Sequence, residues 1–297
     1  ILAGHSFIAA AQSIHFVGAI PVPVDLDEDD WLISPAAIEE AITPRTRAIM
    51  PVHVNGRICK MDKIEEIAKR HNLLIFEDSA QAMGAKFNNK GAGTFGEWGT
   101  YSFYPSKTLG CFGDAGALVT NDPEIYEKVR AMRNHGANRE KSIPLDLNIW
   151  GTNARLDNVH AAILNYKLGY YPEAIKRRRK IARIYNNALQ GINDVRLPPA
   201  PDADPRYYDI YQNYELCYPE RDRLRKYLAD HDIGTIVQWG GFGIHQLQNL
   251  GISRSLPKTD RFFCESLLLP MNHVLTDEQV GHVVSVLDMF FKEHKHG

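Results

Sequence analysis

One lysine of this chain, Lys107, lies in a setting that favours chemistry over solvation. An aromatic run at 101–104 precedes it, and a glycine-bearing turn at 110–116 follows it and leads into an apolar run. Among such small and apolar neighbours a solvated lysine would bury its aliphatic stem at a cost. The pattern indicates an amine held at the end of a strand.

An acid ends a second predicted strand, upstream of this lysine. The apolar run at 73–77 leads into Asp78, and an amide, Gln81, comes three residues later. A carboxylate and a lysine at the ends of neighbouring strands are the two groups that a pyridoxal phosphate enzyme requires. The lysine forms a Schiff base with the cofactor, and the acid keeps the pyridine nitrogen protonated. Taken alone, Asp78 could simply cap the turn after its strand.

These stretches carry a family resemblance. Residues 77–81 and 102–107, followed by 113–116 and 119–122, closely resemble the sugar aminotransferases of the DegT/DnrJ/EryC1/StrS family, and the resemblance runs along the whole chain. It implies an α/β fold of the fold-type-I aminotransferases, with a mostly parallel sheet in a large domain and a smaller C-terminal α+β domain. It also implies a segment before Ile1, so we expect the chain to be incomplete at its N-terminus.

The resemblance implies an activity in amino sugar biosynthesis. An amino group would pass from an amino acid, usually glutamate, to a nucleotide-linked ketosugar through a Lys107 aldimine and a pyridoxamine phosphate intermediate. Lys107 would be both the anchor of pyridoxal 5'-phosphate and the acid/base. Asp78 would face the pyridine nitrogen, Gln81 the ring hydroxyl region, and Ser102 the cofactor phosphate. By residue type alone Ser102 could also be an ordinary strand-end hydroxyl.

Three further residues are assigned by the resemblance. Phe7 would stack on the pyridine ring, although an aromatic residue at a helix start more often packs into a core. Asn153 also has the character of a helix-start or turn residue; by resemblance it would reach the cofactor phosphate of a partner subunit, which implies a homodimer with shared active sites. His245 would approach substrate, or be a satisfied surface histidine. His160 stands where the family commonly has glutamine.

Other functions are weighed against this one. A non-catalytic cofactor-binding or sensor protein could keep the fold and lose turnover, and a keto-cyclitol could replace the sugar as acceptor. Relatives that dehydrate sugars replace the lysine with histidine, and Lys107 argues against that chemistry. The glycines of 91–96 fit a dinucleotide fingerprint, but no strand precedes them and no helix follows, so we reject a nicotinamide site.

The composition excludes several classes of protein. Hydrophobic residues at 44%, charged residues at 24% and a net charge of −2 are ordinary for a soluble globular chain and give no basic field for nucleic acid. No stretch is long and apolar enough for a membrane span. The four cysteines show no paired spacing, so we expect no metal site, no disulfide framework and a cytoplasmic location.

Strands that alternate with helices predict a parallel sheet, whose ligands collect at the carboxyl ends of its strands. We expect a large domain at 1–175 and a small domain at 176–297, the latter following a long helix and a proline-rich linker. The expected helices are 7–17, 34–42, 61–70, 123–134, 156–170, 172–189, 221–231 and 276–291. The residues at 18–25 are expected to form a turn into a strand, the further expected strands are 47–53, 73–77, 116–120 and 211–218, and 138–148 is expected to be a polar loop.

Overall fold

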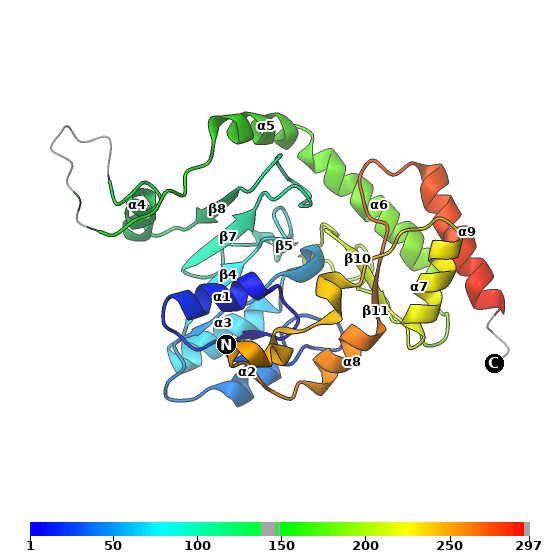
Figure 1. The fold of residues 1–297 in the computed structure, drawn as a ribbon, viewed down its shortest axis with the longest axis horizontal. Helices are drawn as coiled ribbons and strands as arrows, with labels where there is room; N and C mark the ends of the chain where they lie inside the picture. The colour runs from blue at the N-terminus through cyan, green and yellow to red at the C-terminus, as the bar shows by residue number, and fades with distance from the viewer. Residues whose placement is uncertain (138–146, 148, 294–297) are drawn as a thin grey trace.

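The structure is a computed structural model that describes residues 1–137, 147 and 149–293 (Figure 1). Most of the predicted loop at 138–148 therefore lies outside the described residues. The helices are α1 (Ile8–Phe16), α2 (Pro35–Ala41), α3 (Met61–His71), α4 (Pro123–Met132), α5 (Asn158–Leu168), α6 (Tyr171–Leu189), α7 (Arg221–Asp230), α8 (Pro257–Glu265) and α9 (Asp277–Glu293). The strands are β1 (Leu2–Ala3), β2 (Pro23–Val24), β3 (Ala48–Ile49), β4 (Leu74–Asp78), β5 (Lys86–Phe87), β6 (Lys90–Gly91), β7 (Trp98–Ser102), β8 (Gly116–Val119), β9 (Tyr207–Tyr208), β10 (Tyr214–Cys217) and β11 (Ser266–Leu269).

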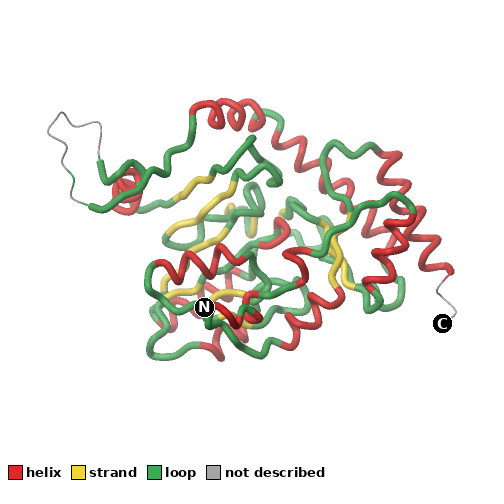
Figure 2. The backbone as a smooth tube through the Cα atoms, in the orientation of Figure 1, coloured by secondary structure: helices red, strands yellow, loops and turns green. Residues whose placement is uncertain are grey.

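The main sheet is mostly parallel, as predicted. Its four strands follow the order β3-β4-β7-β8, with β3, β4 and β7 parallel and β8 antiparallel to β7. The parallel pair β1 and β2 continues it through a bridge from Leu2 to Met50. Figure 2 shows these strands in one half of the molecule and the antiparallel pair β10 and β11 in the other.

The predicted helix starts follow from local capping. Ser34 accepts a hydrogen bond from the Ala37 N–H at 3.3 Å, and Pro35 occupies the first turn of α2, where its missing N–H costs nothing. The sequence reading did not find α8 and β11. Because β11 is a run of only four buried residues, its periodicity cannot separate a strand from a helix.

Two hydrophobic cores meet along α6. Tyr171 and Ile175, in its first turns, belong to the core of the large domain, while Ile181, Tyr185 and Leu189 belong to the second core with α7 and α9. We propose the domain boundary within this helix, at 175/176. No helix in the described part of the chain is long and apolar enough to cross a membrane.

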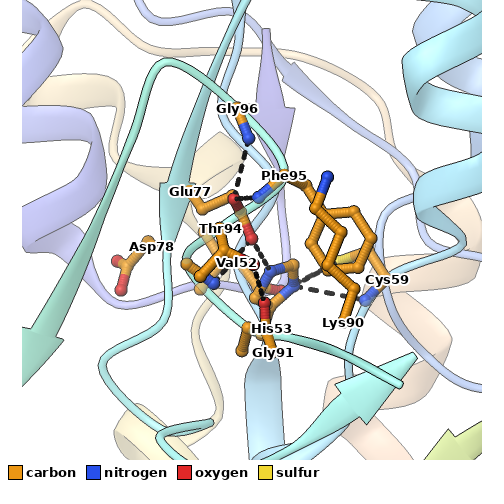
Figure 3. A network of polar contacts seen from close by, with 12 residues as sticks. Val52, His53, Cys59, Glu77, Asp78, Lys90, Gly91, Thr94, Phe95 and Gly96 are labelled. Atoms are coloured by element: carbon orange, nitrogen blue, oxygen red, sulfur yellow. Dashed lines mark hydrogen bonds and ion pairs between the residues drawn. The ribbon is translucent and has the colours of Figure 1, made fainter. Parts of the chain in front are cut away.

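The glycine-rich turn at 91–96 binds a carboxylate of the protein itself. The N–H groups of Gly93, Phe95 and Gly96 all donate to the Glu77 side chain, at 2.8, 2.5 and 2.9 Å (Figure 3). The turn also lies directly against β7, where a Cβ on Gly99 would meet the Gly93 Cα at 2.2 Å. The glycines therefore serve close backbone packing around an internal anion.

His53 completes the shell of Glu77. Its Nε2 lies 2.9 Å from the Glu77 Oε2, and neither side chain is exposed. The Cys59 N–H donates to the His53 Nδ1 at 3.2 Å, which assigns the proton to Nε2. These donors hold the pKa of Glu77 below its usual value against the effect of burial. Asp78, the next residue, points away from this network in Figure 3.

Replacing Glu77 with alanine tests the importance of this buried anion. Loss of the carboxylate leaves His53 and three backbone N–H groups without an acceptor, so Glu77→Ala should cost roughly 3 to 5 kcal/mol of unfolding free energy. The exposed Glu97, at the end of the same turn, is the matched control, and Glu97→Ala should change stability by less than about 0.5 kcal/mol. Urea denaturation measures both, and equal losses would contradict the assignment.

A second buried acid, Glu215, lies on β10 against Asn55. It is 1% exposed on β10, and burial raises its pKa to about 7 although Asn55 donates to its Oε2 at 2.6 Å. Ser266, on β11, also lowers this pKa. His5 faces the carboxyl at 3.9 Å, and burial lowers the pKa of its imidazole to about 4. Both groups are therefore neutral over much of the range between these values.

Glu215 should make stability fall as the pH rises. The unfolded acid ionises near its ordinary pKa of 4.5 while the folded acid stays protonated to about 7. Its contribution is thus complete below pH 4.5 and is lost as the pH rises through 7. The stability of Glu215→Gln relative to wild type should increase by about 3 kcal/mol between pH 4 and pH 8. Urea unfolding at several pH values measures this difference, and a flat difference would refute it.

Candidate functional site

Two parallel strands bring the predicted acid and hydroxyl to one edge of the sheet. Asp78 ends β4 and pairs with Thr100 of β7, and Ser102 ends β7 two residues later. The Ser102 Oγ accepts the Tyr104 N–H at 3.3 Å, which leaves its own O–H free to donate to a ligand. Lys107 follows in the turn that connects β7 to β8.

Asp78 and Lys107 lie within electrostatic reach of each other, and burial dominates both. Burial raises the pKa of Asp78, although the Ala80 N–H donates to its Oδ1 at 3.0 Å and Lys107 opposes the rise. Burial also lowers the pKa of Lys107, against the attraction of Asp78. A lysine of lowered pKa has more neutral amine at neutral pH, as a nucleophile requires.

Part of this edge opens into a cavity of about 1220 Å³. Asp78, Ala80 and Ser102 line its polar end, and mainly apolar residues of α1, β3, β4 and β7 line the rest. The volume exceeds that of an ordinary small-molecule site. Arg45, Arg47 and Arg254 also line the cavity, so groups suited to an anion lie on other parts of its wall as well.

Gln81 is held by a residue that the sequence reading did not single out. The Asn55 N–H donates to the Gln81 Oε1 at 2.7 Å, so the Gln81 side-chain NH₂ is left as the donor. Asn55 adopts a left-handed conformation, with φ of 59°. The Asn55-Gly56 pair in the sequence signals a turn, and that signal could have drawn attention to it.

The turn that carries Lys107 is also clamped from elsewhere. Gln212 accepts the Thr108 N–H and hydroxyl at 2.7 and 2.6 Å, and it donates to the Ser106 carbonyl at 2.9 Å. These residues flank Lys107 on both sides. Gln212 is 104 residues away from Thr108 in sequence, and no local pattern could have indicated the contact.

Phe7 is exposed, whereas an aromatic residue at a helix start more often packs into a core. It is the N-cap of α1, 55% of its surface is accessible, and its ring centroid lies 6.4 Å from that of Trp239. An exposed ring of this kind is free to contact a ligand. Its role at the cofactor stays a prediction.

Asn153 lies in a segment away from these residues, and His245 lies beside Gly4, which follows β1. Asn153 is exposed, in the segment between α4 and α5, and forms a bridge to Asn134. In Figure 1, α4 and the segment leading to α5 project away from the main sheet. His245 is 2% exposed, so it is not a surface residue, and its Nε2 lies 2.8 Å from Asp260. Their proposed roles stay predictions.

The residues at the edge fit pyridoxal phosphate by their chemistry. A carboxylate with one oxygen committed to the Ala80 N–H, an amine of lowered pKa and a hydroxyl with an available proton suit a pyridine nitrogen, an aldehyde and a phosphate, respectively. Among the described residues no cluster of His, Cys, Asp or Glu could hold a metal ion.

Comparison with known proteins agrees with this chemistry. Residues 1–288 match the DegT/DnrJ/EryC1/StrS aminotransferase family. The chain is 38% identical over 297 residues to a pleiotropic regulatory protein of Geobacillus stearothermophilus, covering 98% of this chain and 78% of that protein. It is 37% identical over 292 residues to the dTDP-3-amino-3,4,6-trideoxy-alpha-D-glucose transaminase of Streptomyces venezuelae, covering 97% and 75%.

A solved structure shows the same fold. The crystal structure of DesV from S. venezuelae in complex with a ketimine intermediate superimposes with a TM-score of 0.91 at 35% identity, covering 98% of this chain and 77% of that one. The predicted fold class is thereby confirmed. The chain belongs to the DegT/DnrJ/EryC1/StrS aminotransferase family.

Proposed function

We propose that this aminotransferase moves an amino group from an amino acid, glutamate, to the ketone of a nucleotide-linked sugar, with pyridoxal 5'-phosphate at Asp78 and Lys107. The observation that carries the proposal is the shared edge of β4 and β7, where Asp78 and, in the turn after β7, Lys107 are both half-buried and act on each other's pKa. The sugar class is supported by the dTDP-linked amino sugar in the name of the Streptomyces relative.

Each side chain at the edge then has a defined task. The cofactor, when bound, supplies an aldehyde and a ring that accepts electrons. Asp78 holds a carboxylate against the ring nitrogen, and a cation there favours the charged form that burial alone disfavours. The Lys107 Nζ accepts a proton and returns it, which its lowered pKa favours near neutral pH. Ser102 donates its O–H to a phosphate oxygen.

The remaining predicted residues complete the proposal. Gln81 donates its NH₂ to the ring hydroxyl, Phe7 flanks the ring, and His245 borders the substrate. Asn153 serves the site of a second copy, so the enzyme is a homodimer. Its support is a set of large exposed apolar side chains in the stretch 147–170, which includes Asn153: Leu147, Trp150, Leu156, Val159, Tyr166, Leu168 and Tyr170. Burying such a surface is a common reason for association. A cytoplasmic location stays a prediction.

The proposal is tested by trapping the lysine. Wild-type protein with pyridoxal phosphate should show a Schiff-base absorption band, and borohydride followed by peptide mass spectrometry should place the adduct on Lys107. Lys107→Ala should abolish the band and lower amino transfer from glutamate about a thousandfold or more. Asp78→Asn should keep the band and slow its loss on addition of glutamate about a hundredfold.

Lys86→Ala is the matched control, since Lys86 is an exposed lysine of the same domain. An adduct on another lysine, or an unchanged rate in Lys107→Ala, would refute the assignment. An adduct at Lys107 with no transfer from any amino acid would instead fit a cofactor-binding regulator without turnover. The name of the Geobacillus relative makes that second function worth distinguishing.

A further inference from the structure

One short segment of the small domain contacts both halves of the site. Gln212 bonds to the backbone on either side of Lys107, as described above. Asn213 donates to the Asn55 Oδ1 at 2.8 Å, and Glu215 accepts from the Asn55 Nδ2 at 2.6 Å. The segment 212–215 leads into β10 and lies more than 100 residues beyond Lys107 in the chain.

The contacts to Asn55 fix the direction of its backbone N–H. Both polar atoms of its side chain are fixed by the segment, and its backbone is left-handed, followed by Gly56 with φ of 89°. This conformation is uncommon for a residue with a side chain and persists where neighbours determine it. With its side chain so anchored, Asn55 directs its N–H at the Gln81 Oε1.

The contacts to the lysine turn are equally specific. The amide of Gln212 uses its oxygen for two donors of Thr108 and its nitrogen for one acceptor of Ser106. Gln212 is 7% exposed, so water competes little for these bonds. The position of the Lys107 backbone is therefore set by a residue of the other domain.

Burying the carboxyl of Glu215 costs free energy, and its contact with Asn55 gives a reason for placing it there. Its Oε1 is buried with no hydrogen bond to another described residue, although Ser266 lowers its pKa, and Glu215 lines a cavity of about 30 Å³ with His5 and Asp209, which also bury polar atoms without a partner. An apolar residue at this place in β10 would avoid that cost. The carboxyl does supply the acceptor for Asn55.

We propose that segment 212–215 is the positioning element of the cofactor site, with Gln212 setting the lysine turn and Glu215, through Asn55, setting the amide of Gln81. The proposal rests on the function proposed above. It assigns Gln212, Asn55 and Glu215 as positioning residues: they act on Lys107 and Gln81 and do not touch the cofactor. The small domain thereby holds the two groups in fixed relation.

The first test needs no cofactor. In wild-type protein the side-chain NH₂ of Gln81 should give a distinct pair of amide signals in a ¹⁵N-correlated NMR spectrum, assigned with Gln81→Glu. Glu215→Leu removes the acceptor and should move this pair toward the position of a solvated amide. Glu215→Gln keeps an oxygen acceptor and should leave it near the wild-type position. Unmoved signals in Glu215→Leu would overturn the link between Glu215 and Gln81.

The second test uses pyridoxal phosphate. Gln212→Met keeps the side-chain volume but removes three bonds to the lysine turn, so the condensation of the amine with the aldehyde, which releases one water, should slow about tenfold in stopped-flow absorbance. Glu215→Leu should raise the pKa of the Schiff base by about one unit, because the ring oxygen loses an oriented donor. Glu215→Gln should restore it.

Controls separate the possible failures. The exposed Gln248→Met should condense at the wild-type rate, and far-UV circular dichroism checks that each variant is folded. If Gln212→Met does not fold, Thr108→Val removes one of the three bonds and should slow condensation to a smaller extent. A wild-type protein that forms no Schiff base contradicts the proposed function, and the NMR test still decides the link to Gln81. A wild-type Schiff base with wild-type kinetics and pKa in the variants overturns the positioning role alone.

Discussion

The buried carboxylate of Glu77 is the interaction that fixes the edge of the sheet where the candidate site lies. It gathers donors from two segments: the glycine turn before β7 and His53 beyond β3. Four N–H groups surround one negative charge, which is enough to keep it ionised in a dry environment. Because Asp78 is the next residue, fixing Glu77 on one face of β4 fixes Asp78 on the other.

Burial then gives the site its chemistry. In water at neutral pH an aspartate and a lysine are both charged. An ion pair between them would lower the pKa of the acid and raise the pKa of the amine. At this edge desolvation outweighs the pairing, so the pKa of Asp78 rises and that of Lys107 falls. A bound pyridinium favours the charged acid, and an aldehyde reacts with the neutral amine. The free site therefore favours a ligand that brings a positive charge to Asp78 and an aldehyde to Lys107.

Sequence reasoning reached the part of the site that local patterns encode. The apolar run before Asp78 placed it at a strand end, whereas Ser102 was assigned by the family resemblance; the two share an edge because β4 and β7 are parallel. The environment of Gln81 could not be found in this way, because Asn55 and Glu215 lie 160 residues apart and meet only after the two domains pack. For Phe7, the local pattern alone favours a different environment from the one observed. Its position at a helix start favours burial, but the observed 55% exposure is set by tertiary packing that no local pattern records.

The long helix α6 explains how a small-domain segment can hold a large-domain site in place. Arg178, 5% exposed on α6, donates from one nitrogen to the carbonyls of Tyr211 and Gln212 at 3.0 and 2.9 Å. Burial lowers its pKa to about 10, which still leaves it charged at neutral pH, so these are charge-assisted bonds inside the protein. The first turns of α6 pack in the core of the large domain and its later turns in the second core. One helix thus contributes to both cores and anchors the backbone beside Gln212, whose side chain bonds to the turn that carries Lys107.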